Sequence, residues 1–406
     1  MSVVKLAKSS LFGEITLPPS KSVTHRALIC SFLAGGGNVF PLSESNDMKA
    51  TKGVLKELAQ NSDKAALNCI ESGSTLRFAV PLAAALGANA VFTGEGRLPQ
   101  RPIDEFLRLL PSHGVECESA GSLPLSISGR LESGVYEIAG NVSSQYITGF
   151  LLALPILNGD SKIVLTTPLQ SKPYVDITLQ VMRDYGVVAE ETDYGYFVPG
   201  NQKYKIRDYS VECDWSQAAF FLAGAAISGD VTLLNMNLNS AQGDKEIISV
   251  LKRFGADIET DEMSVRCKKS ALKGICVNVE NIPDAVPAIA AAAAYASGKT
   301  VICGGERLRI KESDRIASVV YNLSALGVDA KETSDGMIIY GGKPLRAAKM
   351  KSFNDHRIVM AFSAAALGVN GECEIDGAQS INKTYPSFFD DYNKLGGKAN
   401  VIHSRE

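Results

Sequence analysis

One unit of helices and strands recurs six times along this chain of 406 residues. Each copy opens with a cluster of polar side chains, continues as a helix of small apolar residues, and then reaches a glycine. The copies begin at Ser20, Ser72, Ser143, Asp214, Asp284 and Asp355. By subtraction, the last five starts lie 71, 71, 70 and 71 residues apart, whereas the first two are separated by 52, so the first copy is shortened. This regularity predicts one supersecondary unit used six times.

A second helix is expected in the later part of each copy, for example in DKEIISVLKRFGADIE and ESDRIASVVYNLSALGVDA. Apolar residues recur there with a helical period, and each stripe ends at a glycine that we expect to cap the helix in a left-handed conformation. Short β-branched runs such as KTVICGG and GMIIYGG predict strands between and after the helices. Each unit therefore contains helix, strand, helix, strand and strand.

The first helix of each unit is apolar on nearly all sides, which predicts burial inside the fold rather than a place on its surface. A chain of 406 residues is also too long for a single ordinary core. Six units therefore fit two domains of three units each, with helices in the interior and sheets as walls.

Composition excludes several functions. The net charge of −3 does not favour binding to nucleic acid or to an anionic membrane. The eight cysteines form no C-x-x-C pair and predict reduced, buried thiols in a cytoplasmic protein. With four histidines and no Cys/His cluster, we expect no metal and no cofactor. The start of the chain does not resemble a signal peptide, and apolar runs such as 288–296 are too short to span a membrane.

Basic residues accompany the helix starts. A cation in the first turn opposes the helix dipole, unless an anion lies between the two. Clusters of this kind therefore predict a substrate set with several phosphate or carboxylate groups. The basic residues in question are Lys21, Arg26, Arg77, Arg97, Arg101, Lys311, Arg315, Arg357 and Lys383.

Two carboxylates join these cations. Asp284 opens an Ala-rich helix, where it could serve as an N-cap, and Glu312 could simply pair with Arg315 three residues later. If both instead face a cation-lined site, they are candidates for general acid and base. The sequence pattern leaves both interpretations open.

The motifs LPPSKSVTHRAL, GEGRLPQRPID, SSQY, SKPYVDIT, IPDA, LRIKESDR, NDHRIVM and NKTYPSFF resemble, in order and spacing, those of the 3-phosphoshikimate 1-carboxyvinyltransferases, also called 5-enolpyruvylshikimate-3-phosphate synthases. The resemblance extends from about Lys5 to Phe389. It implies an α/β fold, the two-domain inside-out α/β barrel with six βαβαββ repeats. One domain would span residues 19–213 and the other residues 1–18 and 214–406, with a substrate cleft between them that closes on binding.

The resemblance also implies a reaction. The family transfers the carboxyvinyl group of phosphoenolpyruvate to the 5-hydroxyl of 3-phosphoshikimate and releases phosphate, by addition and elimination, in the shikimate pathway of aromatic amino acid biosynthesis. We therefore expect these two substrates as partners and a cytoplasmic monomer that binds neither nucleic acid nor membrane.

Residue roles follow from the matching motifs. Asp284 is expected to be the base for the 5-hydroxyl, Glu312 the acid at the methylene carbon, and Lys21 a further catalytic residue. The residues expected to bind 3-phosphoshikimate are Lys21, Ser22, Arg26, Ser143, Ser144, Gln145, Ser171, Tyr174, Asp284 and Lys311. Those expected to bind phosphoenolpyruvate are Lys21, Gly73, Arg97, Gln145, Arg315, Arg357 and Lys383.

Two positions depart from the family pattern. Glu71 stands where many members have Asn, and Arg307 where some have Asn, so neither receives a role. The nearest alternative is the UDP-N-acetylglucosamine enolpyruvyl transferase family, which places a reactive Cys where this chain has Gly96. A second alternative, from another class, is a non-enzymatic repeat protein that binds phosphates, such as a nucleic-acid clamp.

Overall fold

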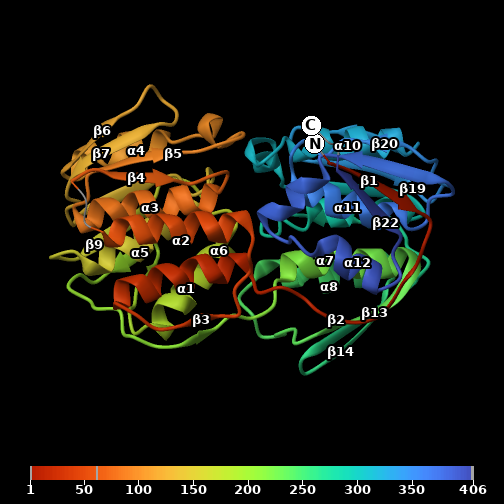
Figure 1. The fold of residues 1–406 in the computed structure, drawn as a ribbon, viewed down its shortest axis with the longest axis horizontal. Helices are drawn as coiled ribbons and strands as arrows, with labels where there is room; N and C mark the ends of the chain where they lie inside the picture. The colour runs from red at the N-terminus through yellow and green to blue at the C-terminus, as the bar shows by residue number, and fades with distance from the viewer. Residues whose placement is uncertain (1, 61–62, 404–406) are drawn as a thin grey trace. The chain divides into compact units, whose positions relative to one another are not determined.

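The computed structural model describes residues 2–60 and 63–403. The chain divides into two compact units. Unit 1 comprises Met1–Pro18 and Glu212–Glu406, and unit 2 comprises Pro19–Val211. In Figure 1, unit 2 runs from red to yellow-green and unit 1 from green to blue, apart from its red N-terminal segment. The predicted domains 1–18 with 214–406, and 19–213, have similar limits, but the cleft expected between them stays a prediction.

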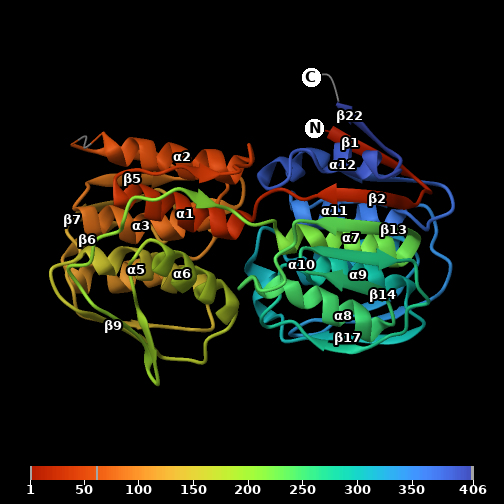
Figure 2. The same cartoon turned by 90° about the horizontal axis from the view of Figure 1, so that it is seen from below.

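Unit 1 is built around three helices that contact one another: α7 (Trp215–Ser228), α9 (Val286–Tyr295) and α11 (His356–Ala366). Every residue of α7 and α11 is buried, as is α9 up to Ala294, which fits the apolar sequence of these helices. The second helices of the units lie outside them (Figures 1 and 2). They are α8 (Ile247–Phe254), α10 (Arg315–Ala325) and α12 (Phe388–Lys394).

Three four-stranded sheets complete unit 1, in the orders β2-β13-β15-β14, β16-β17-β19-β18 and β20-β21-β1-β22. In each, the first two strands named are parallel and the next two pairings are antiparallel. The strands are β1 (Ser2–Ala7), β2 (Leu11–Thr16), β13 (Gly229–Leu234), β14 (Asp257–Asp261), β15 (Ser264–Lys268), β16 (Cys276–Asn278), β17 (Gly298–Cys303), β18 (Asp329–Glu332), β19 (Met337–Gly341), β20 (Lys349–Met350), β21 (Glu372–Asp376) and β22 (Ala399–His403).

The N-terminal strands belong to sheets whose other strands come much later in the chain. Leu11 of β2 pairs with Gly229, and Val3 of β1 pairs with Asp376 and Ile402. Strands β1 and β2 therefore complete the last and the fourth repeats.

Unit 2 repeats this plan with one reduction. Its helices are α1 (Lys21–Ala34), α2 (Asn46–Ala59), α3 (Gly73–Leu86), α4 (Asp104–Leu109), α5 (Ser144–Ala153) and α6 (Lys172–Asp184). Two four-stranded sheets, β4-β5-β7-β6 and β8-β9-β11-β10, have the same pairing pattern as in unit 1. Their strands are β4 (Ala65–Asn68), β5 (Ala90–Thr93), β6 (Val115–Glu118), β7 (Leu125–Gly129), β8 (Val135–Ile138), β9 (Ser161–Leu165), β10 (Glu190–Thr192) and β11 (Gly195–Val198).

The shortened first repeat explains the third sheet of unit 2. This sheet has two parallel strands, β3 (Val39–Phe40) and β12 (Tyr209–Ser210). Among the described residues, this sheet has no counterpart of the antiparallel third and fourth strands that complete the other five sheets, which accounts for the shorter first repeat.

Local sequence signals account for the helix ends. Five of the six polar starts cap a first helix: Ser20, Ser72, Ser143, Asp214 and Asp355 each accept a hydrogen bond from a backbone N–H of the first turn. Asp284 does not, because Ala285 occupies the N-cap position of α9, so the capping interpretation of Asp284 is wrong. The glycines after four second helices adopt the predicted left-handed conformation: Gly114, Gly186, Gly255 and Gly327.

The cysteine prediction holds for most of the thiols. All eight are free, and Cys30, Cys69, Cys213, Cys267 and Cys373 are buried. Cys276 is exposed and Cys117 and Cys303 are half-buried, so the expectation of burial is wrong for these three. Cys276 begins β16, which is an edge strand and pairs with β17 on one side only.

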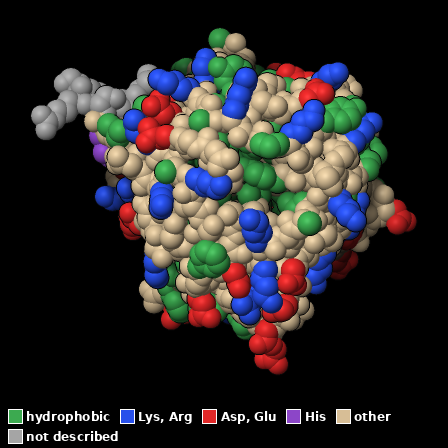
Figure 3. Space-filling model, turned by 90° about the vertical axis from the view of Figure 1, so that its right-hand side faces the viewer, with side chains coloured by type: hydrophobic (Ala, Val, Ile, Leu, Met, Phe, Trp, Pro, Cys, Tyr) green, Lys and Arg blue, Asp and Glu red, His purple; other side chains and the backbone are tan. Residues whose placement is uncertain are grey.

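Charges on the surface of unit 1 are mixed. Figure 3 shows one face, on which Lys and Arg side chains are spread and interleaved with Asp and Glu. Within residues 2–60 and 63–403, every helix is too short or too polar to span a lipid bilayer.

Candidate functional site

Arg315 gathers three carboxylates in unit 1. Its Nη1 lies 2.8 Å from Asp284 Oδ1, its Nη2 2.8 Å from Glu312 Oε2, and its Nε 2.9 Å from Asp355 Oδ2. Arg357 binds the other oxygen of Asp284, with Nη2 to Oδ2 at 2.7 Å. These five residues are called the carboxylate–arginine cluster below. They come from the starts of α9, α10 and α11, so the fifth and sixth repeats together supply one cluster.

The cluster is buried, and that decides its electrostatics. The Arg315 side chain is 1% exposed and Asp355 is fully buried, whereas Asp284 and Glu312 retain 17% and 21% exposure. Burial alone would raise the pKa of Asp284, but the charges of Arg357, Lys311 and Arg315 outweigh it and hold that pKa below its usual range. Asp284 is thus kept as a carboxylate on the open side of the cluster.

The segment that precedes α11 positions Asp355 within the carboxylate–arginine cluster. Asp355 caps α11 through the Arg357 backbone N–H and also accepts from Ser313 Oγ at 3.0 Å. Phe353 and Asn354, just before the cap, have left-handed backbones with φ of 52° and 54°. Such strain in residues other than glycine is concentrated at functional sites.

Two predicted lysines lie in the same unit. Lys383 donates to the Asn354 carbonyl at 2.6 Å, which brings it to the segment that leads into α11. Lys311 directly precedes Glu312, and burial lowers its pKa to about 8. The structure thus places every predicted site residue of unit 1 in or beside the carboxylate–arginine cluster.

Asp244 is a buried carboxylate that sequence reasoning missed. It is 2% exposed, lies in the 3₁₀ helix η4 (Gly243–Glu246), and accepts a hydrogen bond from the Ser216 hydroxyl. Burial, reinforced by the charge of Asp284, raises the pKa of Asp244 to about 7. The Gln-Gly-Asp turn before α8 was the available signal, but an Asp in a turn is usually structural.

The raised pKa predicts a pH-dependent stability. Below the unfolded value of about 3.9 both states are protonated. Between about pH 3.9 and about pH 7, Asp244 is protonated in the folded state but ionised in the unfolded state. The free energy of unfolding therefore falls as pH rises through this range. We expect Asp244→Asn to gain stability relative to the parent protein as pH rises, by at least about 1 kcal/mol between pH 4 and pH 8. Urea unfolding followed by Trp215 fluorescence measures this, and a pH-independent difference would contradict it.

In unit 2, the start of α1 carries three predicted residues. Lys21 Nζ lies 2.9 Å from Asp47 Oδ2, with side chains 15% and 10% exposed. Arg26 is 2% exposed and makes four hydrogen bonds, to Thr178 Oγ1, Thr148 Oγ1 and the carbonyls of Ser22 and Tyr174. Of its five N–H groups, one thus has no hydrogen-bond acceptor within residues 2–60 and 63–403. It mainly ties α1 to α5 and α6.

The starts of α3 and α5 meet. Gln145 Nε2 donates to Ser74 Oγ at 3.0 Å, and the Gln145 Oε1 atom is buried with no hydrogen-bond partner among the described residues. A Cβ on Gly73 would lie 2.2 Å from Arg101 Nη1, so only glycine lets that guanidinium pack on the first residue of α3. The basic-residue pattern included Arg101, but no role was predicted for it.

The serines predicted to bind the 3-phosphate lie at the starts of α5 and α6. Ser143 caps α5 and Ser144 begins it. Ser171 precedes α6 with a left-handed backbone, φ 55°, and is 2% exposed, whereas Tyr174 lies in the first turn and is half-buried. A strained, buried serine before a helix is consistent with a functional position.

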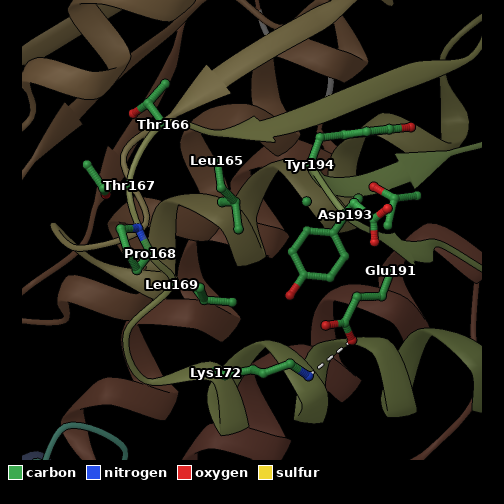
Figure 4. A pocket seen from close by; sticks show the side chains of 12 residues that line it. Leu165, Thr166, Thr167, Pro168, Leu169, Lys172, Glu191, Asp193 and Tyr194 are labelled. Carbon is green, nitrogen blue, oxygen red and sulfur yellow. Dashed lines mark ion pairs between the residues drawn. The ribbon is translucent and has the colours of Figure 1, made fainter.

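A pocket of about 480 Å³ lies beside Lys172, the first residue of α6 (Figure 4). It is formed by the segment before α6 and the β10–β11 hairpin, with Lys172 pointing to Glu191. Lys172 Nζ lies 2.7 Å from Asp176 and 3.1 Å from Glu191. Because two carboxylates already balance this lysine, the pocket is a poor place for a phosphate, and no predicted site residue lines it.

Arg97 is the most open of the predicted residues. It is exposed and precedes the 3₁₀ helix η1 (Leu98–Gln100). Beside it, Gly96 has a φ of 57°, and a Cβ there would lie 2.4 Å from Glu71 Oε2. Glu71 therefore packs against this loop, and a side chain at position 96 would require both a left-handed backbone and displacement of the Glu71 carboxylate.

Comparisons with known proteins support one assignment. A sequence model of EPSP synthase (3-phosphoshikimate 1-carboxyvinyltransferase) matches residues 42–392. The 3-phosphoshikimate 1-carboxyvinyltransferase of Clostridium kluyveri is 40% identical over 98% of both chains, and that of Clostridioides difficile is 36% identical over 98% of both.

Solved structures agree with the fold. An EPSP synthase from Acinetobacter baumannii superimposes with a TM-score of 0.82 at 27% identity, covering 99% of this chain and 100% of that one. The enolpyruvyl transferase NikO from Streptomyces tendae, at 16% identity and a TM-score of 0.81, covers 100% and 99% and shares the fold. The predicted inside-out α/β fold is confirmed, and the chain belongs to the 3-phosphoshikimate 1-carboxyvinyltransferase (EPSP synthase) family.

Proposed function

We propose that this chain transfers the carboxyvinyl group of phosphoenolpyruvate to the 5-hydroxyl of 3-phosphoshikimate, with Asp284 and Glu312 as its proton-transfer pair. Family membership supports the reaction, and one observation carries the assignment of residues. Arg315 holds both carboxylates at 2.8 Å, so the two candidate proton carriers lie on one guanidinium beside a second arginine.

The chemistry assigns each carboxylate a task. Asp284 accepts the proton of the 5-hydroxyl while the hydroxyl oxygen forms a bond to C2 of phosphoenolpyruvate. Glu312 gives a proton to C3, which turns the methylene into a methyl group and yields a tetrahedral ketal. Elimination then removes a proton from that methyl group, breaks the bond from C2 to the phosphate oxygen and restores the vinyl group. General acid and base catalysis of this kind contributes about 10²–10⁴ in rate.

The remaining predicted residues bind anions. Arg315, Arg357, Lys383 and Arg97 hold phosphoenolpyruvate together with Gly73, and Lys21 serves both substrates. Lys311, Ser22, Arg26 and Tyr174 hold 3-phosphoshikimate, with Ser143, Ser144 and Ser171 on its phosphate. The buried Oε1 of Gln145, which has no hydrogen-bond partner in the described part of the chain, supports a ligand contact there, because a buried acceptor without a partner costs about 1–3 kcal/mol.

Substrate binding must also change the cluster. Pairing with Arg315 favours a carboxylate, whereas a proton donor needs the protonated acid. Phosphoenolpyruvate brings its own carboxylate and phosphate to Arg315 and Arg357, and these groups compete with the protein carboxylates. We infer that this competition releases Glu312 and Asp284 for proton transfer.

Both alternative functions fit less well. A nucleophilic cysteine at position 96 would meet the Glu71 carboxylate and require a left-handed backbone, which argues against the UDP-N-acetylglucosamine reaction. A nucleic-acid clamp needs a continuous basic surface. The face of unit 1 in Figure 3 shows mixed charges instead.

Phosphate release tests the reaction. The protein should release phosphate from phosphoenolpyruvate only when 3-phosphoshikimate is present, in equal amounts with the enolpyruvyl product. Omission of 3-phosphoshikimate controls for simple hydrolysis. Release with UDP-N-acetylglucosamine in its place would select the alternative transferase, and no release with either acceptor would overturn both.

The resemblance supports three further proposals. The enzyme acts as a cytoplasmic monomer, its substrates bind in a cleft between its domains, and 3-phosphoshikimate closes that cleft. These extend the proposed reaction and are independent of the residue assignments above.

A further inference from the structure

A chain of four buried polar side chains joins three helices of unit 2. His25 Nδ1 lies 2.7 Å from Thr51 Oγ1, and Thr51 Oγ1 lies 2.7 Å from Thr75 Oγ1. Thr75 Oγ1 donates to Ser72 Oγ at 2.8 Å. The four residues, from α1, α2 and the start of α3, are at most 2% exposed. A buried chain like this is stable only if each donor meets an acceptor.

Proton counting fixes the direction of every bond. A threonine hydroxyl has one proton. Thr75 gives its proton to Ser72, so it must accept one from Thr51. Thr51 then has none left for the imidazole and must accept from Nδ1. His25 therefore carries its proton on Nδ1.

The environment of the second ring nitrogen, Nε2, independently indicates the same tautomer. The Nε2 atom of His25 is buried with no hydrogen-bond partner among the described residues. A proton on Nε2 would be a buried donor without an acceptor, and such donors are rare in folded proteins. Burial, with the charges of Lys21 and Arg26, holds the pKa of His25 well below its ordinary value, so the ring has a single proton.

The direction has a consequence at Ser72. Its Oγ accepts from the Thr75 hydroxyl and from the Thr75 backbone N–H at 3.2 Å, which occupies both lone pairs. Its own proton has no acceptor among residues 2–60 and 63–403. Next to it are the backbone N–H groups of the first turn of α3, which lack intrahelical partners, and the Arg101 guanidinium packed on Gly73.

We propose that His25, Thr51 and Thr75 are positioning residues that hold the Ser72 hydroxyl as a hydrogen-bond donor for an anionic group of phosphoenolpyruvate at the start of α3. This inference rests on the proposed function for the identity of the anion. While these four hydrogen-bonded side chains are intact, the Ser72 hydroxyl cannot donate its proton to Thr75. The start of α3 then presents donors to a phosphate or carboxylate, which matches the role predicted for Gly73.

The tautomer can be tested without substrate. In the full chain with ¹⁵N-labelled histidine, NMR should show one ring with its proton on Nδ1 that does not titrate between about pH 6 and pH 9. His25→Asn should remove that signal and so assign it. A proton on Nε2, or titration in this range, would overturn the proposal.

Matched variants test the contribution to binding. Thr51→Val keeps the shape but breaks the chain, and should raise KM for phosphoenolpyruvate about tenfold, with kcat and KM for 3-phosphoshikimate within about twofold. Thr51→Ser restores the hydroxyl and should return KM to within about twofold. A tenfold change corresponds to about 1.4 kcal/mol.

Variants of His25 provide a second, independent comparison. Asparagine places an amide N–H near the position of Nδ1 and should support binding, whereas glutamine places it near Nε2 and should behave like Thr51→Val. Two outcomes would show that the four polar side chains only pack the helices. One is an equal KM for the two Thr51 variants and for the two His25 variants. The other is a loss of all kinetic parameters in parallel with a lower melting temperature. The parent protein's phosphate release separates this result from failure of the proposed function.

Discussion

Asp284→Asn should lower kcat by about 10³-fold while leaving KM for phosphoenolpyruvate within about threefold. The amide has nearly the shape of the carboxylate but cannot accept the hydroxyl proton. KM should not rise much, because Arg315 and Arg357 lose a competitor for substrate anions when Asp284 loses its charge. Because arginines hold the pKa of Asp284 below its usual range, the loss should be the same from about pH 5 to pH 9. Initial rates of phosphate release measure both constants.

Asp230→Asn is a matched control. Both oxygens of Asp230 are likewise bound by guanidinium nitrogens, here from the single residue Arg266 at 2.8 and 2.7 Å, but on an exposed sheet of the same unit. Its kcat should stay within about twofold of the parent value. If Asp284→Asn changed KM alone, Asp284 would be a binding residue and not the base.

Arg315→Lys should have a comparably large effect, on both activity and stability. A lysine ammonium cannot reach three carboxylates that a planar guanidinium binds through separate nitrogens. Breaking buried pairs leaves charges without partners, so we expect unit 1 to lose about 3 kcal/mol of unfolding free energy. We also expect kcat/KM for phosphoenolpyruvate to fall by at least about 10²-fold.

The only tryptophan of the chain makes the stability test specific to unit 1. Trp215 lies fully buried in α7, so its fluorescence during urea unfolding reports on the unit that contains Arg315. Arg266→Lys is the control, because exposed ion pairs contribute about 0–1 kcal/mol. Equal losses for the two variants would show that the carboxylate–arginine cluster contributes no special stability.

The sequence determined the repeat architecture because its signals are local. A polar N-cap and a glycine C-cap act on backbone groups within one helical turn. The first helix of each repeat is rich in apolar residues such as Ala and Phe, and such a helix is stable only when it is buried. Five caps and four left-handed glycines could therefore be predicted from neighbouring residues. The site residues stood out for the same reason, as charges in the first turns of helices.

Tertiary structure decided what those charges do. Arg315 meets Asp284 across 31 positions of sequence and Arg357 meets it across 73, so no local pattern could distinguish an N-cap from a member of an ion cluster. The burial that raises the pKa of Asp244, and the proton order from His25 to Ser72, likewise depend on segments brought together only by folding. Strand β12, which completes the shortened first repeat, lies about 170 residues after its partner β3. Long-range contacts depend on the geometry of the whole repeat, and neighbouring residues do not encode them.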